Sequence, residues 1–295
     1  MSRESEKNLR KMMNYVEETL SGNADDAETE TLIRQYIAQQ NSFAANEDVP
    51  ECADDYFELA EEADSRKKRL EYLKKALELE PNHLDAARML AEENATTADE
   101  YLEALAALIK KGDKLMEQEG YFSSSMGEFW LLLETRPYMR LHSEYLHTLI
   151  ECGKMRAASA EGRRMLELCE NDNLGIRFSL MHIYALLEEE EAAEKLFERY
   201  GENNESLMLL PMAVLYYKLN KPEKSVEYLN RLALSNKDTK KFFAAVKNGK
   251  LKQYFETMSP YGYQPYSIEE LMLAIAENEF LYANSTNSFC GQMQN

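Results

Sequence analysis

The sequence contains few of the residues that sheet folds and phosphate-binding loops need. Eleven of its 295 residues are glycine, and none falls in a GxxxxGK[ST] or GxGxxG order, which removes the common nucleotide-binding loops. Valine and isoleucine are scarce, apolar and polar residues never alternate for long, and no Asn-Gly or Asp-Gly pair separates two β-like runs. We therefore expect an all-α fold.

Metal ligands and paired thiols are also few. The four cysteines have no paired spacing, which indicates reduced thiols; they are Cys52, Cys152, Cys169 and Cys290. HExxH and CxxC are absent, and His142 and His147 would lie roughly 140° apart around a helix, so zinc is not expected. Carboxylate runs such as Glu188 to Glu191 are typical of solvated helix faces. We expect a non-enzymatic protein with no catalytic residues, no metal and no cofactor.

Basic residues are outnumbered by acidic ones. The chain has 34 lysines and arginines against 53 aspartates and glutamates, a formal charge of −19, and residues 1–120 hold 29 acids and 15 bases. Nucleic-acid binding depends on clustered Lys and Arg, so nucleic acid is not an expected partner. The hydrophilic start MSRESEKNLRK lacks the apolar core of a secretion signal, and no uncharged apolar run is long enough to cross a bilayer. We expect a cytoplasmic protein with no membrane partner.

The most informative pattern is a helical period of 33 to 34 residues. Three consecutive stretches align so that Ala158, Ala192 and Ser225 share one column, 34 and then 33 residues apart. Small residues there allow the two helices of a hairpin to approach closely. Hairpins with this period bury their apolar faces only by stacking on their neighbours. The period therefore predicts a right-handed α-solenoid of the tetratricopeptide-like type.

Both helices of each predicted hairpin carry apolar stripes at helical spacing, which we expect to form the core. In the first helices the stripes are Leu146, Leu149 and Ile150; Ile176, Leu180, Ile183, Tyr184 and Leu187; and Met212, Leu215, Tyr216 and Leu219. In the second helices they include Met165, Leu166 and Cys169; Leu196, Phe197 and Tyr200; and Val226, Leu229 and Leu232.

Local signals mark where helices begin. The capping box predicts three starts, at Thr97 with Glu100, Ser125 with Glu128, and Ser267 with Glu270. Prolines that a first helical turn tolerates indicate three more, at Pro50, Pro137 and Pro222. Pro211, inside LMLLPMAVLYY, implies either a kink or a helix that begins later than the apolar run suggests.

Four parts follow from these patterns. We expect residues 1–45 to form an N-terminal helical cap, 46–120 irregular helical hairpins, 121–236 the regular repeats, and 237–295 a C-terminal helical cap with a mobile tail after Tyr282. In the second part, ALELEPNHLDA ends a helix at Glu80 and, beyond Pro81, opens another after Asn82. The loop MSPYGYQPYS, residues 258–267, has three tyrosines that we expect to fold back onto the repeats.

The segment ETRPYMR, residues 134–140, carries two arginines that need a counter-charge. Arg136 and Arg140 stack on one helix face and repel each other by roughly a few tenths of a kcal/mol. Glu144 can bind one guanidinium, and Glu134, Asp172 or an outside acidic group can bind the other. One interpretation is an internal ion-pair network that locks neighbouring hairpins together. The other is that these arginines face a groove and bind a carboxylate or phosphate of a partner.

On the second interpretation the partner-binding residues are Glu134, Arg136, Tyr138, Arg140, Glu144, Asn171, Asp172, Asn173 and Arg177. Trp130, the single tryptophan, stands between Phe129 and Leu131 and is predicted to be a core anchor rather than a surface hot spot.

These motifs also carry a resemblance. GEFWLLLETRPYMR, residues 127–140, followed by NDNLGIR, residues 171–177, resembles a group of bacterial tetratricopeptide-like proteins related to the repeat domain of the suppression-of-tumorigenicity 7 family. The resemblance covers roughly Asp54 to Leu232 and implies a helical-repeat fold but very little about activity. Some members end in a cysteine-rich zinc motif, which this chain lacks, and Glu170 stands where the group usually has a proline.

Two functions remain open. The favoured one is a scaffold whose concave groove, built from the first helices of the repeats, binds a protein or peptide segment. The alternative is an accessory or regulatory subunit that binds a small anionic ligand in the same groove. A lysine-rich stretch, residues 235–252, has six lysines and one aspartate, and its docking to the acidic half of a second copy would give a weak homodimer.

Overall fold

Helices form all the regular secondary structure in the residues described by this computed structural model, which are 3–19, 26–42, 50–251, 254, 256 and 262–282. The all-α prediction is confirmed for this part of the chain, where β-pairing is limited to an isolated bridge between Glu128 and Cys169. The tail predicted after Tyr282, with Cys290, lies outside the described residues, as do residues 258–261 of the tyrosine-rich loop.

The chain divides into two compact units, and each is described by itself. Unit 1 holds residues up to 124 together with 129–141, and unit 2 holds 125–128 and the residues from 142 onward. The helices of unit 1 are α1 (Arg3–Thr19), α2 (Asp26–Ser42), α3 (Ala53–Glu61), α4 (Arg66–Leu79), α5 (Leu84–Asn94), α6 (Ala98–Gln118) and α7 (Tyr121–Ser124). Helix α8 (Arg136–Glu151) begins in unit 1 and ends in unit 2.

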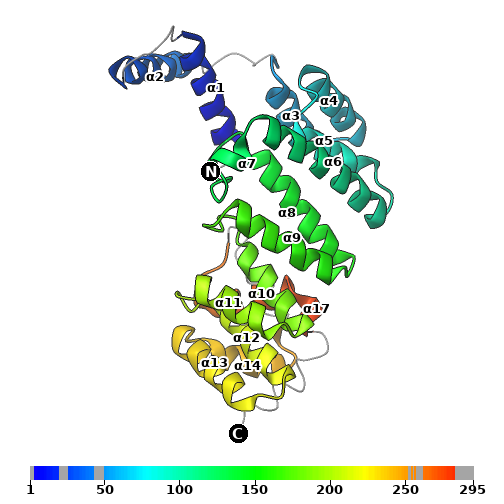
Figure 1. Cartoon of the computed structure of the whole chain (residues 1–295), viewed down its shortest axis with the longest axis vertical. Helices are drawn as coiled ribbons and strands as arrows, with labels where there is room; N and C mark the ends of the chain where they lie inside the picture. Colours follow the sequence, from blue (N-terminus) through cyan, green and yellow to red (C-terminus); the bar gives the residue numbers. More distant parts are fainter. Residues whose placement is uncertain are drawn as a thin grey trace. The chain divides into compact units, whose positions relative to one another are not determined.

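In unit 1 each helix from α3 to α7 packs against the next one along the chain (Figure 1). Small and apolar side chains fill the space between α3, α4 and α5, namely Ala53, Phe57, Ala60, Leu73, Ala76 and Ala86. Helix α4 ends at Leu79. Helix α5 begins after His83, whose imidazole accepts a hydrogen bond from the Ala86 amide. The break predicted within ALELEPNHLDA is therefore confirmed.

Unit 2 contains the hairpins that the repeat predicts. Its helices include α9 (Met155–Leu168), α10 (Ile176–Leu187), α11 (Glu190–Tyr200), α12 (Ser206–Lys218) and α13 (Pro222–Ser235). Helix α10 packs against α11, and α12 packs against α13. Between hairpins, α10 also packs against α9 and α12, so neighbouring pairs share a core.

The same turn joins the two helices of three hairpins. Gly153, Glu188 and Asn220 each adopt a left-handed backbone, with φ of 68°, 60° and 57°. The amide of the following residue reaches back to a carbonyl five residues earlier, from Lys154 to Leu149, Glu189 to Tyr184 and Lys221 to Tyr216, at 2.9 to 3.0 Å. This is the Schellman ending, which satisfies the last carbonyls of the first helix.

One column of small residues is displaced from its predicted register. The fourth residues of α9, α11 and α13 are Ala158, Ala193 and Ser225, and all three are buried. The expected Ala192 is half-buried, so the alignment was wrong by one residue in the middle hairpin. The Ser225 hydroxyl donates to the Ala213 carbonyl at 2.8 Å, so α13 lies close against α12 at this position. Val226, predicted to be core, is 50% exposed.

The C-terminal helices pack against the first helices of two hairpins. Helix α16 (Ile268–Ala276) packs on α12 and on α14 (Thr239–Lys247), while α17 (Glu279–Tyr282) packs on α10. As a result α12 is buried from Ser206 to Tyr216, including Pro211, rather than along one stripe. Because α12 already begins at Ser206, the suggestion that it begins later is wrong.

The other predicted helix starts have mixed outcomes. Thr97 caps α6, and its hydroxyl accepts the Glu100 amide at 3.2 Å. Ser267 caps α16, but the Glu270 carboxylate accepts the amides of Tyr266 and Ser206 instead of closing a capping box. Pro137 and Pro222 lie in first turns as predicted. Pro50 precedes α3, which begins at Ala53, and no helix starts at Ser125, so those two predictions are wrong.

His182 of α10 is buried beneath the C-terminal helix α17. Its side chain is fully buried, its ring meets the edge of Tyr282 at 5.7 Å between centroids, and its Nδ1 donates to the Phe178 carbonyl at 2.7 Å. Burial lowers the pKa of His182 from 6.5 to about 4, although the bond to Phe178 opposes this. The imidazole is therefore neutral in the folded protein at neutral pH.

The recurring turn can be tested with a matched pair of substitutions. Gly153→Ala is expected to lower the free energy of unfolding by about 1 kcal/mol, because a Cβ at this φ strains the backbone while meeting no atom within 4 Å. Glu188→Gly removes the same strain and is expected to raise it by up to about 1 kcal/mol. Urea unfolding of both variants is the measurement, and an unchanged midpoint for Gly153→Ala would contradict the assignment.

His182 should make unit 2 sensitive to acid. The unfolded chain binds a proton at His182 below pH 6.5 and the folded chain only near pH 4, so stability falls as the pH is lowered through this window, by about 3 kcal/mol in all. Burial raises the pKa of Glu270, which acts in the opposite direction, so the difference between wild type and His182→Phe is the quantity to compare. Denaturant unfolding from pH 7 to pH 4 should show a smaller loss in the variant; equal losses would refute this role.

Candidate functional site

The segment before α8 is irregular, and its hydrogen bonds fix the point at which α8, with the arginines of ETRPYMR, begins. The Thr135 hydroxyl donates to the carbonyls of Phe129 and Leu132, which fixes the turn from which α8 starts at Arg136. Phe129 is fully buried, whereas Trp130 is only partly buried, so the core anchor is Phe129 and the prediction for Trp130 is wrong.

Tyr138 belongs to the same core. Its ring lies 5.9 Å from that of Phe129 between centroids, and its hydroxyl donates to the Asp113 carboxylate at 2.6 Å. The ring packs on Gly112 of α6, where a Cβ would lie 2.7 Å from a ring carbon. Tyr138, predicted to contact a partner, has no exposed surface.

Arg136 and Arg140 share one carboxylate, that of Glu6 from α1. Arg136 donates from Nη1 to one oxygen of Glu6 at 2.9 Å, and Arg140 donates from Nη1 to the other at 2.8 Å. Arg140 also donates hydrogen bonds to both carboxylate oxygens of Asp85 on α5, from Nε at 3.0 Å and from Nη2 at 2.5 Å. Arg136 donates from Nε to the Trp130 carbonyl at 2.9 Å, and its guanidinium lies 5.5 Å from the Trp130 ring.

We call these four side chains the arginine clasp: Glu6, Asp85, Arg136 and Arg140. Their side chains are between 5% and 15% exposed, and two positive charges face two negative ones. Burial alone would lower the pKa of Arg140, but the carboxylates of Asp85 and Glu6 raise it above its ordinary value. Arginine side chains stay protonated in proteins, so two guanidinium charges face two carboxylates in the clasp.

The acidic partners of the arginines differ from those that we expected. The prediction named Glu144, Glu134, Asp172 or an outside group, whereas the described contacts come from Glu6 and Asp85. Glu134 is exposed and Glu144 is half-buried. The geometry thus favours the internal-network interpretation for the arginine pair in this conformation.

The predicted residues of NDNLGIR form a separate cluster in unit 2. Asp172, with φ of 48°, accepts the amides of Ile176 and Arg177 at 2.7 and 3.1 Å, and so closes the start of α10. Arg177 donates to Asp172 at 2.8 Å and to Glu205 at 3.1 Å, and its guanidinium lies 3.9 Å from the Phe178 ring. This arrangement caps α10 and ties it to the start of α12.

The remaining residues of that segment line a turn. Asn171 and Asn173 are exposed, and the Asn173 side-chain oxygen lies 3.3 Å from the Cys169 sulfur. The Glu170 amide donates to the Gly127 carbonyl at 2.8 Å, beside the bridge between Glu128 and Cys169. A proline at position 170 has no amide proton to make this bond, which gives Glu170 a structural role at this corner.

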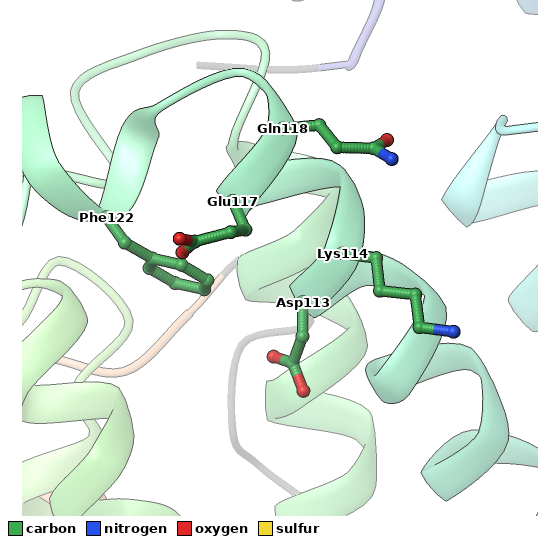
Figure 2. A pocket seen from close by; sticks show the side chains of 5 residues that line it. All are labelled: Asp113, Lys114, Glu117, Gln118 and Phe122. Carbon is green, nitrogen blue, oxygen red and sulfur yellow. The ribbon is translucent and has the colours of Figure 1, made fainter.

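A depression in unit 1 lies beside the Tyr138 core, between the end of α6 and α7 (Figure 2). It is lined by Asp113, Lys114, Glu117, Gln118 and Phe122. Figure 2 shows the Glu117 carboxylate beside the Phe122 ring, while Lys114 points away from both. A second depression, in unit 2, is lined by Glu189, Glu190, Glu191, Ala192 and Lys195. With carboxylates in excess in both, neither favours a small anion.

The described residues contain neither a metal-binding cluster nor a membrane-spanning helix. Within the described ranges, no group of three or more His, Cys, Asp or Glu side chains is arranged to hold a metal ion. None of the described helices is both long and apolar enough to span a bilayer.

Sequence reasoning missed Glu6 and Asp85, which supply the charge that the arginine pair requires. Glu6 lies 130 residues before Arg136, and nothing in a local window links them. A usable signal was present at Asp85, which stands in the first turn of α5 among buried neighbours, where an acidic side chain needs a partner.

Comparisons of the chain with protein-family models, with curated proteins and with solved structures found no match. The resemblance to tetratricopeptide-like proteins therefore stays a prediction that rests on the motifs themselves.

The clasp predicts a local effect of removing one charge. In Glu6→Gln the two arginines lose their shared carboxylate, and breaking a buried ion pair of this kind costs about 3 kcal/mol. Because Glu6 lies on α1, which adds no residue to the apolar cluster of α3 to α5, trypsin should cut within α1 on the order of a hundredfold faster while cleavage of α3 to α6 stays unchanged. Mass spectrometry of timed digests gives both rates. Glu30→Gln on exposed α2 is the control, and equal α1 cleavage in the two variants would argue against the clasp.

Proposed function

We propose that this chain is a non-enzymatic helical-repeat scaffold that binds a segment of another protein. We also propose that its hairpins stack in the right-handed sense of a tetratricopeptide-like α-solenoid. The recurring Schellman turn and the packing of neighbouring hairpins within each unit support this second proposal.

The observation that carries the binding proposal is the way in which α1 is attached. It is a helix held on α3 and on the start of α8 mainly through charged side chains, outside the apolar core of α3 to α5. A surface that holds one helix by matched charges has the chemistry needed to hold another.

The groove that the sequence predicts, on the first helices of the repeats, is less available in unit 2. There α16 and α17 pack on α12 and α10, the first helices of two hairpins. We therefore place the partner-binding surface in unit 1. The arginines of the clasp are bound by Glu6 and Asp85, so the alternative of a small anionic ligand gains no support from them.

Crosslinking in host extract followed by mass spectrometry tests this function. We expect crosslinks from unit 1 to one segment of another protein, and we expect a synthetic peptide of that segment to bind the purified chain in calorimetry. Glu191→Lys, an exposed change in α11, is the control and should bind equally well. A thermal-shift screen with phosphorylated metabolites runs in parallel: a concentration-dependent rise in Tm with a metabolite, and no peptide binding, would favour the alternative.

A further inference from the structure

The contacts of α1 follow a fixed order of charge. Its Glu6 enters the arginine clasp, and one to five positions later three bases meet the acids of α3. The Lys7 ammonium lies 2.8 Å from Asp55 and 2.5 Å from Glu58, Arg10 lies 2.9 Å from Asp54, and Lys11 lies 2.9 Å from Asp55.

Few of the described apolar side chains of α1 are fully buried. Glu6 and Val16 are buried, while Leu9 and Met12 are half-buried. The apolar cluster between α3, α4 and α5 is filled without any residue from α1. The partly exposed ion pairs of Lys7, Arg10 and Lys11 contribute little net stability and are screened by salt, so they hold α1 on α3 only weakly.

Departure of α1 would leave two charged patches of opposite sign on one surface. Both arginines would lose the Glu6 carboxylate and Arg140 would keep Asp85, so this patch would have one negative charge fewer. On α3, Asp55 and Glu58 would lose the lysines that face them. Hydrogen bonds from Lys7 and Lys11 help to keep the pKa of Asp55 well below its ordinary value, although burial alone would raise it. The Asp55 carboxylate is therefore charged while α1 is in place, and without the lysines it would attract other bases.

We propose that α1 is a displaceable occupant of an interaction surface made by Asp54, Asp55 and Glu58 of α3 with Arg136 and Arg140 of α8. The partner is a helix of another protein that carries an acidic residue followed by basic residues one, four and five positions on. This inference rests on the proposed function and names its surface and the chemistry of its partner.

A helix fits this surface better than a free anion does. A carboxylate or phosphate ion would satisfy the arginines but would not replace the lysines that face Asp55 and Glu58 of α3. Positions i, i+1, i+4 and i+5 spread over roughly 140° of a helix, and in α1 the same four positions reach both patches, so a single helix can serve both. The acidic patch on α3 and the basic patch on α8 thus specify both the sign and the order of the partner's charges.

The test uses the full-length chain and a labelled peptide with the sequence of residues 3–19. In the variant Lys7→Glu/Arg10→Glu/Lys11→Glu, α1 is repelled by α3 while the surface stays intact. Fluorescence anisotropy should show that the peptide binds this variant at least tenfold more tightly than it binds wild type, and more weakly at high salt. If the triple variant loses helicity, Lys7→Glu alone replaces it.

A charge exchange locates the peptide on the surface. Glu58 has Lys7 as its ion-pair partner in the described contacts, and its side chain plays no part in capping α3. Adding Glu58→Lys to the displaced variant should weaken binding of the natural peptide, and a peptide with Glu in place of Lys7 should restore it. A peptide in which Glu6 is replaced by Gln should bind more weakly, because the arginines then lack a carboxylate.

Several results would overturn the proposal. One is a folded displaced variant that does not bind the peptide. Another is equal affinity of the natural and charge-exchanged peptides for the Glu58→Lys variant. Equal affinity for wild type and the displaced variant would place the peptide elsewhere. A wild-type chain that sediments as a dimer at low salt would assign the surface to α1 of a second copy. Crosslinks to a partner that avoid α3 and the start of α8 would leave the proposed function standing while this inference fails.

Discussion

The attachment of α1 to unit 1 depends on the neutrality of a buried group of charges. Two arginines on the first turns of α8 would repel each other and lose much of their hydration if they stood alone. Glu6 and Asp85 remove that difficulty together, and in doing so they attach α1 and α5 to the same short stretch of α8. The clasp therefore sets the position of α1 by charge rather than by apolar packing. Charge can also be supplied by another molecule, which is why this contact bears on function.

Unit 2 is held together differently. Helices α10 and α12 are buried on nearly every side, because hairpin neighbours and the C-terminal helices both pack on them. Polar groups fix the C-terminal helix in place: the Glu270 carboxylate accepts from the Ser206 amide and hydroxyl, and Asn236 donates to Ser206 and to the Ser267 carbonyl. A buried network of this kind orders the first helices of these hairpins and covers them. The contrast between the units is the reason for placing partner binding in unit 1.

The helical character, the hairpins and the break at Pro81 could be predicted because helical spacing and capping are local properties of the sequence. The register of Ala193 was missed because two adjacent alanines satisfy the same pattern. Val226 was misplaced because Ser225 takes the buried position beside α12. The arginine pair was recognised from its spacing alone. Its partners were not, since Glu6 and Asp85 lie far away in the sequence and their meeting depends on the tertiary fold. The burial of α12 on all sides likewise depends on α16, which no local window contains.

The central claim is that α1 is held mainly by charge and can leave while the helices beneath it stay folded. Amide hydrogen exchange of the wild-type chain at low and high sodium chloride, followed by mass spectrometry, tests it most directly. The claim predicts that residues 3–19 lose protection as salt increases, while α3 to α6 keep theirs. Protection of α1 that is independent of salt, or that is lost only together with α3 to α6, would contradict it.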